Sequence, residues 1–134
     1  MALREVGGVR ELHIVIGQPE ARAIHTAWLG TPVARPGTWD LFVSTIGLLD
    51  AQVERAAITA VLDRRHFYAA IELRRGHDLI RLDCRASDAI ALALRTMGAT
   101  IVADEQVLAD AGIVAPPPGA PAPPDQIGPW PGRP

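Results

Sequence analysis

The sequence contains no lysine and no asparagine, and the missing lysine excludes several kinds of chemistry. All 13 basic residues among the 134 are arginine, and with 15 acidic residues the net charge is -2. Without lysine there is no Walker-type phosphate loop, no Schiff-base lysine and no serine–lysine pair. A nuclease core that needs a catalytic lysine is excluded as well. The net charge disfavours a strongly basic nucleic-acid-binding protein and leaves room for a local basic face.

Cysteine is nearly absent, and long apolar runs are missing. The one cysteine, Cys84, allows neither an intrachain disulfide nor a multi-cysteine zinc site. It alternates with Leu82 and Ile80, as a small buried residue would. The longest uninterrupted apolar run, Ala89–Leu94, is too short to cross a membrane, and no signal peptide is recognisable. We therefore predict a cytoplasmic protein with no membrane segment.

The residues that are abundant divide the chain into two parts. Apolar residues make up 49% of the sequence, enough for a folded domain. Nine of the 12 prolines lie in Pro116–Pro134, where their density disfavours helices and sheets. We predict one compact domain over residues 1–115 and a flexible, Pro-rich tail over residues 116–134. The tail has PxxP spacings, so contact with a protein partner is the alternative to a plain flexible tail.

Strand and helix patterns alternate over residues 1–115. The glycine pair Gly7-Gly8 predicts a tight hairpin turn near the start. Predicted helices cover residues 19–29, 39–50, 88–97 and 104–111, and predicted strands cover residues 3–6, 10–16, 53–62, 66–74, 79–84 and 100–103. Three consecutive strands in the middle indicate an antiparallel meander. The expected fold class is α+β, a single compact domain with a mixed, largely antiparallel sheet and helices packed on it.

The predicted helix over residues 88–97 should be the most buried element, because nearly all of its residues are apolar. Two acidic residues elsewhere are candidate catalytic residues. Glu20 falls within the apolar arc of the first predicted helix, where a carboxylate is costly unless it is paired or binds a ligand. Asp40 shares a helical face with the small residues Ser44 and Gly47, which leave space for a ligand. Both acids also fit a first helical turn, where free N–H groups favour a carboxylate.

A denser group of polar residues follows the last strand of the meander. Asp83 and Arg85 lie at its end, and Ser87 and Asp88 begin the apolar helix. Two nearby acids can share Mg²⁺ or Mn²⁺, and an arginine can hold a phosphate with two bonds. Asp83 and Asp88 are therefore candidate catalytic residues and metal ligands, and Arg85 and Ser87 are candidate substrate-binding residues. The alternative is a helix cap with a salt bridge.

Several of these segments resemble the bacterial and plant bifunctional nuclease domain family. The stretches that carry the resemblance are IVIGQPEARAI (residues 14–24), RPGTWDL (35–41), ITAVLDRRHFYAAIEL (58–73), DCRASDAIALALR (83–95) and TIVADEQVLADAGI (100–113). The resemblance implies a compact α+β domain, a homodimer, and nuclease activity on DNA and RNA. Relative to the family pattern the chain begins late, so we expect an N-terminally short member. Trp39 replaces a histidine of that pattern, and Ala86 replaces a proline.

Two functions follow from these observations. The first is a nuclease that hydrolyses phosphodiester bonds in DNA or RNA, with metal assistance as one option. Its acids would be the four candidates Glu20, Asp40, Asp83 and Asp88, with Arg85 holding phosphate. The second is a dimeric, non-catalytic interaction module, favoured by the net negative charge and by Trp39, which removes an acid–base candidate. Convergence of the four acids in one pocket would favour the nuclease.

Overall fold

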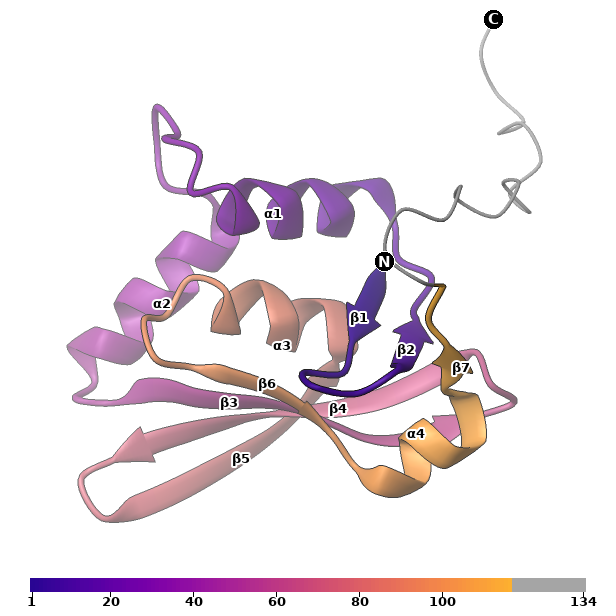
Figure 1. Ribbon diagram of the computed structural model, residues 1–134. Helices are drawn as coiled ribbons and strands as arrows, with labels where there is room; N and C mark the ends of the chain where they lie inside the picture. Colours follow the sequence, from indigo (N-terminus) through magenta and orange to yellow (C-terminus); the bar gives the residue numbers. More distant parts are fainter. Residues whose placement is uncertain (117–134) are drawn as a thin grey trace, which may run out of the picture.

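The computed structural model describes residues 1–116, which form four helices and seven strands (Figure 1). The strands are β1 (Ala2–Arg4), β2 (Arg10–His13), β3 (Gln52–Leu62), β4 (His66–Arg75), β5 (Asp78–Arg85), β6 (Thr100–Ala103) and β7 (Ile113–Val114). The helices are α1 (Gln18–Trp28), α2 (Thr38–Leu48), α3 (Ala86–Ala93) and α4 (Glu105–Ala111). The predicted Pro-rich tail lies outside the described residues, apart from Pro116. Within residues 1–116, every helix is too short to span a bilayer.

The strands form two sheets, and together they confirm the predicted α+β class. The larger sheet has the order β5-β4-β3-β6, in which β3, β4 and β5 make the predicted antiparallel meander and β6 runs parallel to β3. The smaller sheet, β1-β2-β7, is antiparallel. The expectation of one sheet was wrong, because β2 ends at His13 and pairs with β7, which is too short to show a strand pattern in the sequence.

The first hairpin also differs from the prediction. In place of a two-residue turn at Gly7-Gly8, the chain leaves β1 at Arg4 and enters β2 at Arg10. Glu5 accepts hydrogen bonds from the Arg10 guanidinium at 2.6 and 3.0 Å, and this ion pair closes the wider loop. Charge-assisted bonds of this length are among the stronger side-chain contacts.

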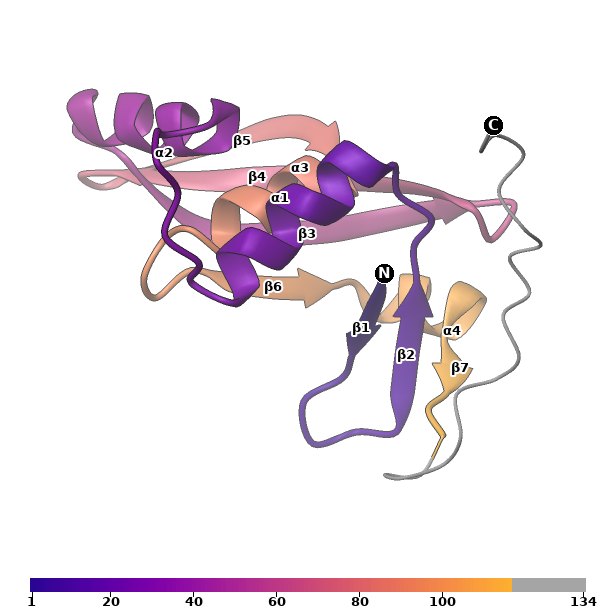
Figure 2. The ribbon, with the colours of Figure 1, turned by 90° about the horizontal axis from the view of Figure 1, so that it is seen from above.

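Helices cover one face of the larger sheet in two layers (Figure 1). α3 lies directly on the sheet, and α1 packs over α3. α2 lies at the end of the sheet where β3 begins, and the smaller sheet with α4 lies beside the β6 edge (Figure 2). Most of the core lies between the sheet and α3 and is filled by alanine, isoleucine and leucine, and Leu12 of β2 and Val107 of α4 extend it.

α3 is almost wholly buried, which confirms the prediction for this segment, although its bounds differ. It begins at Ala86, with Arg85 as the N-cap residue, so Ser87 lies inside the first turn and does not cap the helix. It ends at Ala93 because the next backbone N–H groups, of Arg95 and Thr96, bond to carbonyls three residues back. That pattern tightens the chain into a turn and ends the α-helix.

Candidate functional site: a cleft around Arg85

Arg85 bridges two of the predicted acidic residues. Its Nε and Nη2 groups donate to the two carboxylate oxygens of Asp88 at 2.7 and 3.0 Å, and its Nη1 group donates to Glu20 at 3.1 Å. The bond to Asp88, followed by the charges of Asp88 and Glu20, raises the pKa of Arg85 above its ordinary value, so the guanidinium stays charged. The structure thus brings together Glu20, Arg85 and Asp88, and Ser87 lies between the last two in the sequence.

The first turn of α1 places Glu20 in this group. Gly17 is the N-cap residue and Pro19 lies in the first turn, so Glu20 follows at a position where the helix dipole favours a carboxylate. The Glu20 side chain is 16% exposed. Its position in the apolar arc of the helix is thereby explained, because the ion pair with Arg85 offsets the cost of burying the charge.

A cleft of about 580 Å³ opens beside this group, at the edge where β4 begins and β5 ends. The residues that line it come from the β2–α1 linker, α1, the β3–β4 turn, the start of β4, the end of β5 and the start of α3. They include Ile14, Ile16, Gly17, Glu20, Arg65, His66, Phe67, Tyr68, Arg85 and Ser87. Its volume lies within the range of small-molecule and nucleotide sites. The cleft can therefore hold a ligand against the charged group.

Ser87 contributes a buried polar group to the cleft. The residue is 7% exposed and lines the cleft. Because Ser87 lies in the first turn of α3, its hydroxyl adds to the free N–H groups there, which favour an anion.

Arg65, His66 and Tyr68 also line the cleft, and the sequence analysis did not single them out. The turn before them has Asp63 and Arg64 in the left-handed region, at φ 50° and 56°, and this turn directs Arg65 and His66 to the cleft edge. Arg65 has no ion-pair partner within the described part of the chain. The register of the meander could have indicated these residues, because it pairs Tyr68 of β4 with Arg85 of β5 and so brings the start of β4 beside Arg85.

The structure places the predicted metal ligands Asp83 and Asp88 in different surroundings. Asp83 is exposed, pairs with Ala70 across the sheet and does not line the cleft, whereas Asp88 is engaged by Arg85. No cluster of three or more His, Cys, Asp or Glu side chains within residues 1–116 is arranged to hold a metal ion. Mg²⁺ is commonly held by one or two carboxylates together with a substrate phosphate, so metal assistance by Mg²⁺ or Mn²⁺ stays a prediction.

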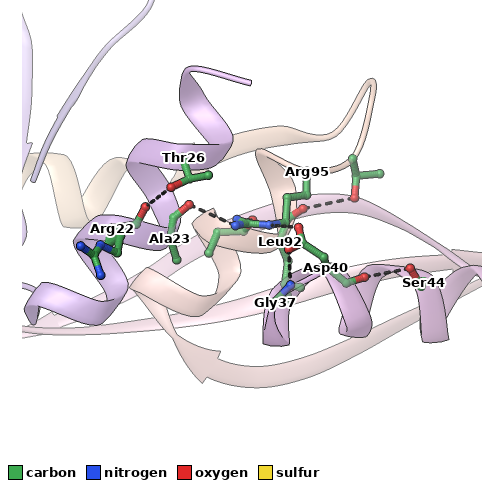
Figure 3. Close-up of polar contacts among 10 residues, drawn as sticks. Arg22, Ala23, Thr26, Gly37, Asp40, Ser44, Leu92 and Arg95 are labelled. Carbon is green, nitrogen blue, oxygen red and sulfur yellow. Dashed lines mark hydrogen bonds and ion pairs between the residues drawn. The ribbon is translucent and has the colours of Figure 1, made fainter. Parts of the chain in front are cut away.

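Asp40 belongs to a separate group of contacts that joins three helices (Figure 3). Arg95, after α3, donates to the Asp40 carboxylate at 2.7 Å, to the Ala91 carbonyl at 2.9 Å and to the Ala23 carbonyl of α1 at 3.2 Å. Asp40 also accepts a 2.7 Å bond from the Gly37 N–H at the start of α2. We call Asp40 and Arg95 the helix clamp. Its contacts give Asp40 a structural role outside the cleft.

The helix clamp predicts a pH-dependent contribution to stability. The Gly37 N–H and then the Arg95 guanidinium lower the pKa of Asp40 below 3.8. A carboxyl group whose pKa is lower in the folded state stabilises the protein at pH values above its unfolded-state pKa. This stabilisation is lost as the pH falls through the folded-state pKa. Asp40→Asn should therefore reduce the free energy of unfolding by about 1–2 kcal/mol at pH 7, and the difference from the parent should shrink below pH 4.

Urea unfolding of both proteins at pH 7 and at pH 3 measures this difference. The control is Asp83→Asn, which removes an exposed carboxylate that forms no ion pair within residues 1–116. It should change the free energy of unfolding by about 0.5 kcal/mol or less. A cost of Asp40→Asn that is equal at both pH values would contradict the electrostatic role of the clamp.

Trp39 lies next to Asp40 in the first turn of α2. Its side chain is partly buried against the hydrophobic core and does not line the cleft. The replacement of the histidine of the family pattern therefore leaves the side chains of the cleft unchanged. Trp39 consequently gives no structural argument that the cleft has lost an acid–base group.

Comparison with known sequences gives two relatives and one family model. Two uncharacterized proteins of Mycobacterium tuberculosis, from strains H37Rv and CDC 1551 / Oshkosh, are each 39% identical over 116 residues, which is 87% of this chain and 68% of each relative. The family model described as the bifunctional nuclease domain matches residues 1–116, which include both the cleft and the helix clamp. The chain therefore belongs to the bifunctional nuclease domain family.

Proposed function

We propose that this protein is a nuclease that cleaves phosphodiester bonds in nucleic acid at the cleft around Arg85. The observation that carries the proposal is the placement of Arg85. Its side chain is 67% exposed at the cleft, and two carboxylates fix it in position. Its three bonds leave N–H groups of the guanidinium free for a phosphate. A positioned guanidinium stabilises the charge that develops during phosphoryl transfer.

Other residues of the cleft support binding of a polynucleotide. Arg65 supplies a second guanidinium, and Ser87 with the N-terminus of α3 supplies donors for phosphate oxygens. Tyr68 is half exposed and offers a ring on which an unpaired base can stack. These features favour single-stranded DNA or RNA as the substrate, because stacking on a side chain needs an unpaired base. We place this activity in the cytoplasm.

The second candidate function is a dimeric interaction module. α2 exposes four large apolar side chains, Leu41, Phe42, Leu48 and, at its end, Leu49, each more than half exposed. Exposed apolar groups gathered on one element are typical of protein contacts. We propose that a second copy of the chain covers this helix. Such a homodimer is compatible with nuclease activity. If the protein cleaves no nucleic acid, formation of the homodimer would be its main function.

The experiment that tests the nuclease measures cleavage of labelled single-stranded RNA and DNA by the purified chain. Each substrate is incubated with Mg²⁺, with Mn²⁺ and with EDTA. We expect the parent protein to cleave, and Asp83→Asn to retain its rate within about twofold, because Asp83 lies outside the cleft. Absence of cleavage in every condition, together with a mass of two chains by light scattering, would favour the interaction module.

A further inference from the structure

Gly17, the N-cap residue of α1, lines the cleft and lies against the Glu20 side chain. Its φ and ψ are -72° and 166°, an extended conformation that any residue can adopt. Serine, aspartate or asparagine at this position would stabilise the helix, because their side chains accept a hydrogen bond from a free N–H group. Neither the backbone conformation nor the start of the helix therefore requires glycine here.

The space beside Glu20 gives a reason for the glycine. A Cβ atom at residue 17 would lie 2.5 Å from Glu20 Oε2, far shorter than the roughly 3.5 Å of an ordinary non-bonded contact. The Cδ atom of Pro19 would lie at an ordinary distance of 3.6 Å. A side chain at residue 17 would therefore conflict with one group, the carboxylate that bonds to Arg85.

The Glu20 carboxylate is confined from two sides. Its Oε1 accepts the bond from Arg85 Nη1 at 3.1 Å, and its Oε2 occupies the space that a Cβ of residue 17 would need. The carboxylate is the end of a flexible side chain, so it would move away from a larger residue 17 at little cost to the fold. Its bond to Arg85 would then be lost, whereas the two bonds from Arg85 to Asp88 would remain.

We propose that Gly17 is a positioning residue that seats Glu20 against Arg85 and so fixes the direction of the Arg85 guanidinium in the cleft; this inference rests on the nuclease function proposed above. Without the bond to Glu20, Arg85 is held by Asp88 alone, and this pair can shift relative to a phosphate in the cleft. The role concerns the phosphate group, so it applies to DNA and RNA alike.

Gly37 provides a matched control in the same chain. It is the N-cap residue of α2, and an acid, Asp40, follows three residues later, as Glu20 follows Gly17. A Cβ at residue 37 would lie 3.4 Å from Asp40 Oδ2, which is an ordinary contact. Both substitutions by alanine have the same effect on a helix start, and only the one at residue 17 displaces a carboxylate.

The test measures cleavage of single-stranded DNA and RNA by variants of the full chain. Gly17→Ala should lower the rate by roughly tenfold or more, since misplacement of a reacting group by about 1 Å can cost roughly 10²-fold. Gly37→Ala should cleave like the parent. Gly17→Ser can cap α1, so its thermal midpoint should be at or above that of the parent while its cleavage rate falls.

A double-mutant cycle shows whether Gly17 acts through Glu20. Glu20→Ala should lower the rate at least as much as Gly17→Ala, and the double variant should match Glu20→Ala. If the added methyl group only obstructs the cleft or unfolds α1, the two losses will multiply, and that result would overturn the inference.

A crystal structure of Gly17→Ala makes the test independent of cleavage. Glu20 Oε1 should lie beyond hydrogen-bond distance of Arg85 Nη1, and the bonds from Arg85 to Asp88 should be retained. A retained bond between Glu20 and Arg85, or a parental cleavage rate of Gly17→Ala, would overturn this inference and keep the nuclease. Absence of cleavage by the parent with Mg²⁺, with Mn²⁺ and in EDTA would overturn both.

Discussion

Leu92→Asp is expected to leave no folded protein. Leu92 lies in α3, is 9% exposed, and belongs to the core between this helix and the larger sheet. An unpaired carboxylate there costs several kcal/mol, and a domain of this size has a total stability of about 5–15 kcal/mol. The expected result is insoluble protein, or soluble protein whose far-ultraviolet circular dichroism shows no cooperative thermal transition.

Two further variants show whether burial causes this effect. Leu92→Ala should fold and should lose about 2–5 kcal/mol in the free energy of unfolding, because it leaves a cavity without a charge. Met97→Asp places the same carboxylate four residues beyond α3 at a residue that is 99% exposed, and it should unfold like the parent. A folded Leu92→Asp with a parental thermal midpoint would refute the position of α3 in the core.

Arg85→Ala is expected to lower kcat/KM for nucleic-acid cleavage by roughly 10²–10³-fold, the usual effect of removing one donor to the transition state. The fold should survive, because the side chain is 67% exposed and exposed ion pairs contribute little to stability. Arg85→Lys should recover part of the loss. Lysine restores the charge, but it cannot bond to Asp88 with two N–H groups as the guanidinium does.

The matched control for Arg85 is Arg81→Ala on the same strand. Arg81 is exposed, lies outside the cleft, and forms no ion pair within the described residues. Arg81→Ala changes the net charge by the same amount as Arg85→Ala. The variant therefore measures any long-range electrostatic effect on RNA or DNA binding. Equal losses in the two variants would show that the effect comes from overall charge and would contradict a specific role of Arg85.

Local patterns in the sequence predicted much of the fold. The alternation of β4 and the apolar run of α3 each depend on neighbouring residues, so both elements were predicted, α3 with different bounds. The separation into two sheets was missed, because it depends on β7, whose two residues carry no periodic pattern. The end of α3 was misplaced because no helix-breaking residue precedes Gly98, whereas the helix ends earlier through the backbone bonds of Arg95 and Thr96.

The candidate site also depends on contacts between residues that are far apart in the sequence, and local patterns do not predict such contacts. The sequence indicated Glu20 as a costly carboxylate and Arg85 as a phosphate ligand, and the structure joins them across 65 positions of the chain. The sequence did not separate Asp40 from this group, because an acidic residue in the first turn of a helix has the same sequence pattern in the helix clamp as in an active site. His66 was missed because its place in the cleft depends on the turn at residues 63–65 and on the strand register.

The helix clamp has a consequence for the evolution of the cleft. Arg95 bonds to the carbonyl of Ala23, which lies one turn after Glu20 on the same helix. This hydrogen bond helps to fix α1, and with it the Glu20 carboxylate, although Arg95 does not line the cleft. Misplacement by about 1 Å can cost roughly 10²-fold in rate. Selection for catalysis would therefore preserve Arg95 and Asp40 as strictly as residues of the cleft itself.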